Sequence, residues 1–377
     1  MDKDGKPLVS ICTTFFNADK YIHRLIQSCL NQTYGNIEIV LVDEASIDAS
    51  QKIVEEYTKY DSRVKYFRLD EKIGIAKCLK KTFEFARGRY VIFPGADDWL
   101  ARDFIEKGVN DFEKYPDAAG IVPKIITLLD TGNNQFEYHS EINISSDIYS
   151  REWFVRRLYR STIGVSSIMA FVRREDAQDF MEYFMKEYYD NLSFPEQLRK
   201  MYLRLFGTDM LFFLHILRNY KSFVWDNSLI FLKIIQYQSI TFDSFNQDSV
   251  AGIFKWYYYH FLCYAHAYQQ EYLHFYRGIK IFIGSEMLST TLIYFFKSGF
   301  KSSFLNITES RKLLSEFFAD FSFFEIVATI VFFIPRIIYR FFSFAARSIF
   351  KKRVSKKKLA KVIRRENFLN SEGNFTV

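Results

Sequence analysis

Residues 37–48 read IEIVLVDEASID, an apolar, β-prone run that ends abruptly in acids and a serine. A short continuous apolar run of this kind predicts a strand buried on both faces, as in a parallel sheet that is covered by helices. Comparable runs stand at residues 8–12, 64–69 and 90–93, and polar residues follow each of them. The sequence therefore predicts four buried strands with polar loops at their carboxyl ends.

Amphipathic segments separate these strands. Residues 19–31, 49–59 and 74–86 repeat apolar side chains with the period of about 3.6 residues that is typical of a helix. Strands and helices thus alternate from residue 8 to about residue 130. This alternation predicts an α/β fold, with a mainly parallel sheet and helices on both faces.

Three polar loops follow the predicted strands, at residues 13–17, 43–48 and 95–98. The carboxyl ends of parallel strands share one edge of a sheet, and ligands of such folds bind beyond that edge. We therefore expect the three loops to converge there and to form the functional site.

The remainder of the chain is less regular. We expect a loop at 132–150, a strand at 163–172, helices at 175–190, 196–205 and 208–220, and one or two strands within 223–235. The predicted organisation is one domain at 1–235, with halves at about 8–130 and 131–235, then a helical region at 236–320 and a tail at 321–377. Phe and Tyr are frequent after residue 200, so the C-terminal region is expected to be helical and rich in aromatic residues.

Composition sets broad limits on function. The 377 residues are 49% hydrophobic and 25% charged, which supports a buried core and excludes a wholly disordered chain. The net charge of +7 suits an anionic partner without naming one. The four cysteines show no CxxC spacing, which favours buried free thiols in a reducing compartment. The N-terminus has no apolar signal segment, so we expect a cytoplasmic protein.

Asp97 and Asp98 are adjacent carboxylates in the loop after the fourth predicted strand. Carboxylate oxygens suit a hard cation such as Mg²⁺ or Mn²⁺, which can also bind phosphate oxygens. The alternative is a solvated turn in which Asp98 caps the following helix. Spacing alone leaves both interpretations open.

The ordered set of motifs resembles the family 2 glycosyltransferases of GT-A fold. VSICTTFFN (9–17), SCLNQTY (28–34) and EIVLVDEASID (38–48) are similar to that family's VSVIIPTYN, SVLNQTY and EIIVVDDGSTD. ARGRYVIF (86–93) resembles its A-x-G-x-Y-I-x-F strand, and GADD (95–98) coincides with its D-x-D-D loop. The resemblance covers residues 8 to about 105 and implies a Rossmann-like GT-A domain that uses a nucleotide-sugar donor, with a UDP-sugar favoured.

This resemblance implies roles for individual residues. Thr14 and Phe16 would line the nucleotide base, and Asp43 and Glu44 would contact base and ribose. The carboxylates of Asp97 and Asp98 would serve the metal ion and the diphosphate. The general base of the inverting reaction would be Asp209, in FGTDMLFF (206–213), which opens a predicted helix. The alternative for Asp209 is a carboxylate that only stabilises the helix dipole.

Several positions depart from the family pattern. Gly95 stands where the first acid of D-x-D-D is usual, Glu44 replaces an Asp, and Thr13 replaces a Pro. The family's N-x-G-x-x-x-A-R-N segment reads KIGIAKCLK (72–80), which loses the Arg but leaves Lys77 or Lys80 to reach the diphosphate. These departures bear on the identity of the donor more than on the fold. The Q-x-x-R-W motif of processive synthases is absent, so addition of a single sugar is expected.

The tail combines an apolar stretch with basic residues. Residues 321–335 are apolar but are interrupted by Glu325, and they fall short of the roughly 20 residues of a transmembrane helix. Downstream, Arg336, Arg340 and Arg347 share one helical face, and a polybasic run follows. The pattern resembles an interfacial anchor, which predicts that 321–358 attaches peripherally to an anionic membrane surface. A core helix, a dimerisation helix that would form a homo-oligomer, and a true membrane span are the alternatives. Nucleic-acid binding is not expected, since no nucleic-acid motif accompanies the charge.

The sequence thus predicts an inverting glycosyltransferase that acts at the inner face of the cytoplasmic membrane. It would transfer one sugar to a hydroxyl of a glycan or lipid-linked glycan and would depend on Mn²⁺ or Mg²⁺. The alternatives are a non-catalytic glycan-binding or scaffold protein on a degenerate GT-A fold, and a nucleotidyltransferase. Against the last, residues 11–17 contain no glycine for a phosphate loop.

Overall fold

The computed structural model describes residues 5–132, 135–142, 144–153, 170–190, 212–213, 215–236, 326–327 and 329–331. The chain divides into two compact units, one of residues 1–235 with 356–377 and the other of residues 236–355. The fold described below belongs to the first unit. The expected helical region at 236–320 and nearly all of the tail lie outside the described residues.

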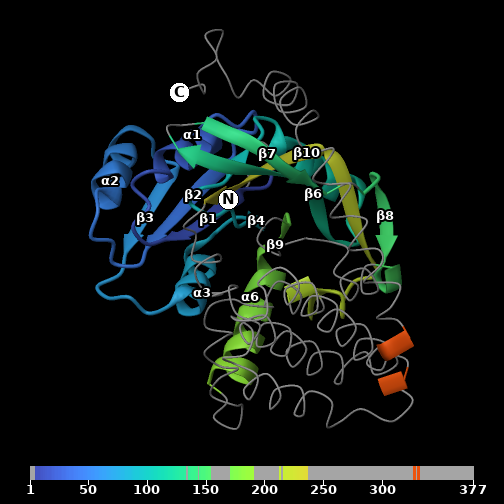
Figure 1. The fold of residues 1–377 in the computed structure, drawn as a ribbon. Helices are drawn as coiled ribbons and strands as arrows, with labels where there is room; N and C mark the ends of the chain where they lie inside the picture. Colours follow the sequence, from blue (N-terminus) through green and yellow to red (C-terminus); the bar gives the residue numbers. More distant parts are fainter. Residues whose placement is uncertain are drawn as a thin grey trace. The chain divides into compact units, whose positions relative to one another are not determined.

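The first sheet contains five strands in the order β3-β2-β1-β4-β9 (Figure 1). The strands are β1 (Val9–Phe15), β2 (Ile37–Asp43), β3 (Val64–Arg68), β4 (Tyr90–Ile92) and β9 (Val172–Arg173). The first four are parallel, and only β9 runs antiparallel, beside β4. Every residue of β2 is buried, as the continuous apolar run predicts.

Helices cover both faces of this sheet. They are α1 (Ile22–Leu30), α2 (Ser50–Tyr60), α3 (Ile75–Phe85), α4 (Phe104–Lys114) and α6 (Arg174–Phe184), the last continued by a π-helical turn, η2 (Met185–Tyr189). In α1 the buried side chains Ile22, Leu25, Ile26 and Cys29 follow helical spacing and form one apolar stripe. Burial of that stripe, more than helix propensity, fixes the helix against the sheet.

The order of the strands reverses next to β1. From β1 the chain moves outward through β2 to β3, and the connection through α3 then returns it to β4 on the other side of β1. In an open α/β sheet the carboxyl ends on either side of such a reversal enclose the ligand crevice. The fold therefore places the crevice beyond the ends of β1 and β4.

A second sheet has the strand order β5-β10-β6-β7. Strand β8 also pairs with β10. Its strands are β5 (Trp99–Leu100), β6 (Ala118–Gly132), β7 (Gln135–Glu141), β8 (Asp147–Ser150) and β10 (Ser222–Gln236). Strands β5 and β8 pair with β10 in the antiparallel direction, and β6 pairs with β7 in the same way. The expectation of a loop at 132–150 is wrong, because this polar stretch contains β7 and β8.

One strand boundary also differs from expectation. The first strand continues to Phe15, because Thr13, Thr14 and Phe15 pair with Leu41, Val42 and Asp43 of β2. Of the strand expected at 163–172, only residues 170–172 are described, and β9 (Val172–Arg173) lies at that end of the range. The helix expected at 175–190 is present as α6 and η2. Residues 196–205 lie outside the described residues, as do 208–211 and 214 of the helix expected at 208–220.

Aromatic rings join the first sheet to α4. The ring of Tyr90 stacks on that of Phe112 with centroids 4.5 Å apart, and both contact Phe171, at 5.6 and 5.7 Å. Such ring pairs add about 1 kcal/mol beyond the burial of their area. Gly108 on α4 leaves room for this packing, since a Cβ there would lie 3.2 Å from the ring of Phe171.

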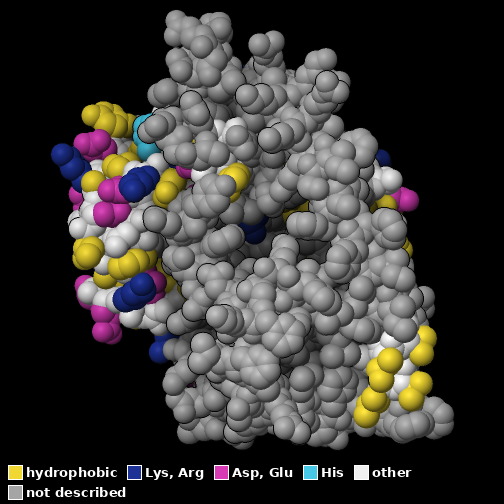
Figure 2. All heavy atoms as spheres, in the orientation of Figure 1, with side chains coloured by type: hydrophobic (Ala, Val, Ile, Leu, Met, Phe, Trp, Pro, Cys, Tyr) yellow, Lys and Arg dark blue, Asp and Glu magenta, His cyan; other side chains and the backbone are white. Residues whose placement is uncertain are grey.

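The described part of the surface mixes side-chain types. Figure 2 shows basic, acidic and apolar groups interspersed on the described face. In the second unit Val327, Ile330 and Val331 are exposed, and they belong to the short segment drawn orange in Figure 1. Within the described residues, the model contains no helix with the length and hydropathy to cross a bilayer.

Candidate nucleotide-sugar site

The loops after β1, β2 and β4 meet at the reversal of strand order. The hydroxyl of Thr13 near the end of β1 donates a hydrogen bond of 3.0 Å to the carbonyl of Pro94, which follows β4. The backbone N–H of Glu44 donates to the carbonyl of Phe15 at 2.9 Å. The predicted convergence of the three polar loops is therefore present.

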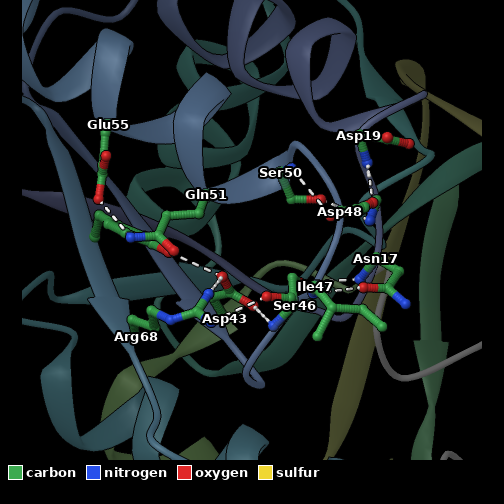
Figure 3. A network of polar contacts seen from close by, with 12 residues as sticks. Asn17, Asp19, Asp43, Ser46, Ile47, Asp48, Ser50, Gln51, Glu55 and Arg68 are labelled. Carbon is green, nitrogen blue, oxygen red and sulfur yellow. Dashed lines mark hydrogen bonds and ion pairs between the residues drawn. The ribbon is translucent and has the colours of Figure 1, made fainter.

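Polar contacts lock the loop after β1 to the loop after β2 (Figure 3). The Asn17 side-chain oxygen accepts from the N–H of Ile47 at 2.9 Å, and the N–H of Asn17 donates to the Ser46 hydroxyl at 2.9 Å. Each loop also contains one residue with a left-handed backbone. These residues are Asn17, with φ of 53°, and Ala45, with φ of 59°. The two loops are thus tightly turned and joined by hydrogen bonds.

Asp48 extends the same network to the start of α2. Its carboxylate accepts from the backbone N–H groups of Asp19 and Ser50, each at 3.0 Å. Burial acts to raise the pKa of Asp48, but the hydrogen bonds from Ser50 and Asp19 outweigh it, and the pKa lies below its ordinary value. Asp48 is therefore a structural carboxylate that holds two loops of the site together.

Asp43 is fully buried at the end of β2 and has several partners. Its Oδ1 accepts from the N–H of Ser46 at 2.8 Å, and its Oδ2 accepts from the hydroxyl of Tyr66 at 2.8 Å and from Nη1 of Arg68 at 2.9 Å. Arg68 also donates to the carbonyl of Ser46 at 2.9 Å. The carboxylate expected to contact the nucleotide thus organises its own loop, and Arg68 neutralises its charge.

Glu44 lies beside Asp43 and is also buried. Its carboxylate accepts a hydrogen bond from the backbone N–H of Gly74, the residue that precedes α3. Gly74 has φ of 89°, a conformation that glycine adopts without the steric cost of a Cβ. Glu44 therefore connects the β2 loop to the start of α3.

Thr14 and Phe16 are half-buried at the end of β1. Side chains that line a nucleotide base must be partly accessible, and these two are. The Lys72 ammonium lies 3.7 Å from the centroid of the Phe16 ring, a close cation–π contact. Lys77 lies in the first turn of α3 and is exposed. Lys72 was not among the predicted contacts, although it opens the segment that replaces the family's Asn-x-Gly.

The side chain of Asp98 is buried and accepts hydrogen bonds from two backbone N–H groups. One oxygen accepts from the N–H of Gly95 at 2.9 Å, and the other accepts from the N–H of Ile234 on β10 at 3.2 Å. Burial and the charge of Asp97 raise the pKa of Asp98, while Lys233 opposes the shift. Asp98 thus ties the β4 loop to the second sheet.

Asp97 is half-buried on the same loop and acts electrostatically on Tyr21, Arg24 and Asp98. A Cβ at Gly95 would lie 3.0 Å from Oδ1 of Asp97 and 3.0 Å from Oδ2 of Asp98. The two carboxylates therefore occupy the space beside Gly95, where the family commonly has another acid.

Asp97 and Asp98 are too few to form a metal site from protein side chains alone. Within the described residues, no group of three or more His, Cys, Asp or Glu side chains could hold a metal ion. Mg²⁺ is commonly bound through one or two carboxylates, with waters and substrate phosphates completing the shell. Asp97 and Asp98 fit that mode, in which the diphosphate supplies ligands that the protein lacks.

Asp209, the expected general base, lies outside the described residues. Six of the expected site residues lie at or just beyond the carboxyl ends of β1, β2 and β4: Thr14, Phe16, Asp43, Glu44, Asp97 and Asp98. The sequence did not predict that Tyr66 and Arg68 would bind the carboxylate of Asp43. The signal for this contact was weak, since it consisted of a strand that ends in Arg and precedes an acidic stretch.

Known proteins resemble this chain in sequence and in fold. The family model of glycosyl transferase family 2 matches residues 10–180. An uncharacterized glycosyltransferase of Haemophilus influenzae is 40% identical over 104 residues, which are 28% of this chain and 42% of that protein. The putative teichuronic acid biosynthesis glycosyltransferase TuaG of Bacillus subtilis is 39% identical over 102 residues, 27% of this chain and 40% of that protein. The chain thus spans less than half the length of these curated relatives.

The fold matches a solved structure over most of its length. The crystal structure of S. aureus TarS 1-349 in complex with UDP-GlcNAc superposes with a TM-score of 0.58 at 17% identity, covering 88% of this chain and 89% of that one. At this identity the match establishes the GT-A fold only. The family match itself identifies residues 10–180 as a glycosyl transferase family 2 domain.

Proposed function

We propose that this chain is an inverting glycosyltransferase that transfers a single sugar from a nucleotide-sugar to an acceptor hydroxyl. The observation that carries the proposal is the pair of carboxylates, Asp97 and Asp98, at the strand-order reversal of a family 2 domain. Ligands bind at that point in open α/β sheets. The two carboxylates stand where the diphosphate of a donor requires charge compensation.

The loops of the crevice suit a nucleoside diphosphate. Phe16 and Thr14 offer a half-buried surface for the base, and the hydrogen bonds around Asp43 keep that surface rigid. Lys72 and Lys77 add positive charge near the start of α3, where the unpaired N–H groups of a helix also favour anions. A UDP-sugar is our first choice of donor, and UDP-GlcNAc is its simplest test because it is the ligand of the TarS complex.

Bound Mn²⁺ or Mg²⁺ would neutralise charge on the leaving diphosphate. Asp97 and Asp98 would hold the cation, and Asp209 takes the proton of the acceptor hydroxyl. The acceptor oxygen then forms a bond to the anomeric carbon as the bond from that carbon to the diphosphate oxygen breaks, and the nucleoside diphosphate leaves. Attack from the opposite face inverts the configuration, so an α-linked donor gives a β-linked product.

The acceptor in this proposal is a glycan or a lipid-linked glycan of bacterial surface-polysaccharide assembly. A teichuronic acid biosynthesis glycosyltransferase is among the relatives, which supports that setting. The basic tail would hold the enzyme on an anionic membrane surface beside such an acceptor, since each Lys or Arg near the surface contributes about 1 kcal/mol.

Turnover of the donor tests the proposal. With Mn²⁺ and UDP-GlcNAc or another UDP-sugar, the purified chain should release UDP in the presence of acceptor. Asp209→Asn should reduce turnover by about 100-fold or more, the usual contribution of a general base, while UDP affinity stays unchanged. Asp61→Asn, which breaks an ion pair with Arg63 away from the crevice, is the matched control. Tight UDP binding without release from any nucleotide-sugar would favour the non-catalytic alternative.

Membrane attachment has a separate test. The triple change Lys351→Glu, Lys352→Glu and Arg353→Glu should release the chain from vesicles that contain anionic lipid. The matched control reverses Lys52 and Lys59, two exposed basic side chains on α2. An unchanged distribution of the triple variant would refute peripheral attachment through the basic tail.

A further inference from the structure

Three exposed apolar side chains lie on one face of a helical segment in the second unit. They are Val327, Ile330 and Val331, which are 42%, 52% and 59% exposed. At about 100° per residue, these positions fall within about 100° of one another around a helix. Thr329 lies on the opposite side and is fully buried. The segment therefore turns apolar groups outward and a polar group inward, the reverse of a helix that packs on a core in water.

These three side chains, which we call the 327–331 face, are clustered. The other large apolar residues that are exposed in the described part of the chain lie singly in the β2 loop and on α2, α3 and β8, and they are Ile47, Tyr60, Ile75 and Ile148. Single exposed apolar residues are ordinary, whereas a contiguous apolar patch marks an interaction site. Figure 2 shows an apolar group over the segment drawn orange in Figure 1. The 327–331 face thus calls for a partner with an apolar interior.

Basic residues follow this face closely in the sequence. Arg336 and Arg340 come first, and the polybasic run at 351–358 comes next. Acyl chains complement an apolar face, and anionic lipid headgroups complement positive charge. A second copy of the chain would offer apolar surface, but its net charge of +7 would not complement these basic residues. Apolar surface and charge together favour an anionic bilayer as the partner.

We propose that the 327–331 face inserts into the acyl boundary of an anionic bilayer and gives the chain a salt-resistant contact with the membrane. This inference rests on the proposed membrane attachment and adds an apolar contact to the electrostatic one. The segment lies in the interface rather than across it, because the apolar stretch at 321–335 is shorter than the roughly 20 residues of a span. Membrane binding then has two parts, of which salt screens only the electrostatic one.

Neither part is sufficient by itself. Each half-exposed side chain of the face gains about fivefold in partition when it leaves water, which corresponds to about half of the full transfer of a Val or Ile side chain. Three such side chains give about 100-fold, and even a whole acyl chain gives only marginal, reversible binding. Stable attachment takes two signals, and the basic run supplies the second.

Flotation of the full chain with vesicles of phosphatidylcholine and phosphatidylglycerol measures both parts. The comparison is between about 0.1 M and about 1 M NaCl, where the Debye length falls from about 10 Å to about 3 Å. The wild type should lose part of its binding at the higher salt concentration and retain the rest. The double change Ile330→Gln and Val331→Gln should weaken binding by about tenfold or more at both salt concentrations, because two apolar contacts are lost.

The controls separate insertion from loss of structure. The double change Tyr60→Gln and Ile148→Gln removes two exposed apolar side chains from the first unit and should leave flotation unchanged. Ile330→Phe enlarges the apolar face and should tighten binding severalfold, a gain that misfolding cannot mimic. Unchanged flotation of Ile330→Phe would refute insertion of the face.

Two results distinguish this inference from attachment through the basic tail alone. If the triple change at Lys351, Lys352 and Arg353 releases the chain but the Ile330 and Val331 double variant floats like the wild type, the face is not inserted and electrostatic attachment stands. If the wild type does not float with these vesicles, the proposed attachment fails, and the inference fails with it.

Sedimentation velocity without lipid tests the other occupant of the face. The wild type and the Ile330→Gln, Val331→Gln variant should sediment as the same species. A wild-type dimer that this variant dissociates would assign the 327–331 face to a second copy of the chain and would overturn the inference.

Discussion

Ala45 has a left-handed backbone in the loop after β2, with φ of 59°. The corresponding conformation at Asn17 costs less because Asn adopts left-handed backbone more readily than other L-residues, and its side chain also accepts a hydrogen bond from Ile47 of the other loop. Ala45 has no such compensation, and a left-handed L-residue costs roughly 1–2 kcal/mol. The loop retains this strain because its hydrogen bonds fix both neighbouring segments.

Ala45→Gly should therefore stabilise the domain. Relief of the Cβ strain exceeds the entropy that glycine loses on folding, so the free energy of unfolding should rise by about 0.5–1 kcal/mol. Denaturant titration followed by circular dichroism measures the change. Ala49→Gly, at a residue with φ of −77°, has no strain to relieve and should not stabilise. An equal gain in both variants would contradict the explanation.

At the residue scale, the sequence predicted which residues lie at the carboxyl ends of the strands, but it did not show which contacts they make. Asp43 was expected to contact the nucleotide, and the structure shows both of its oxygens engaged by the protein. That result depends on Arg68, which pairs with Asp43 across the β2–β3 register. Strand register is a tertiary property, so a motif alone could not reveal this ion pair.

At the element scale, helix α4 carries Asp111, a half-buried carboxyl group that lies near a second acid, Asp226. Burial and the charge of Asp226 raise the pKa of Asp111 to about 7. A carboxyl group with a raised pKa in the folded state binds protons more tightly there than in the unfolded chain. Its contribution to stability is therefore present below about pH 4 and is lost as the pH rises to about 7.

Asp111→Asn should thus stabilise the domain at pH 8, by on the order of 1 kcal/mol after allowance for solvent screening, and should matter little at pH 4. Urea unfolding at the two pH values checks this. Asp61→Asn is the control of opposite sign, since the hydrogen bonds from Arg63 lower the pKa of Asp61 and favour its charged form. A stability difference for Asp111→Asn that does not vary with pH would refute the electrostatic origin.

The parallel strands β1, β2 and β4 could be predicted from the sequence because they are short, buried and mostly apolar runs. In the second sheet, strands were expected within 223–235, where β10 lies, but β8 could not be predicted because it is mostly exposed, and even its apolar Ile148 is 48% exposed. A strand with both faces partly in water shows no clear alternation. Its pairing with β10 supplies what the sequence pattern lacks.

At the scale of the whole molecule, the site is closed by contacts between distant parts of the chain. The bond from Ile234 to Asp98 spans 136 residues, and the N–H of Ala101 donates to the carbonyl of Ile230 at 3.1 Å. The family motif predicts the Asp97–Asp98 loop, but only the structure shows that β10 holds it. Strand β10 thus fixes a loop that lies more than 100 residues earlier in the chain.

The central claim is that Asp97 at this crevice serves nucleotide binding. Isothermal titration of UDP into the full chain with Mn²⁺ tests it most directly. The account predicts saturable binding that weakens by about tenfold or more in Asp97→Asn, since a charged interaction of 1.5–3 kcal/mol is lost, with no change in Asp61→Asn. Equal UDP affinity of the wild type and Asp97→Asn, or no UDP binding at all, would contradict it.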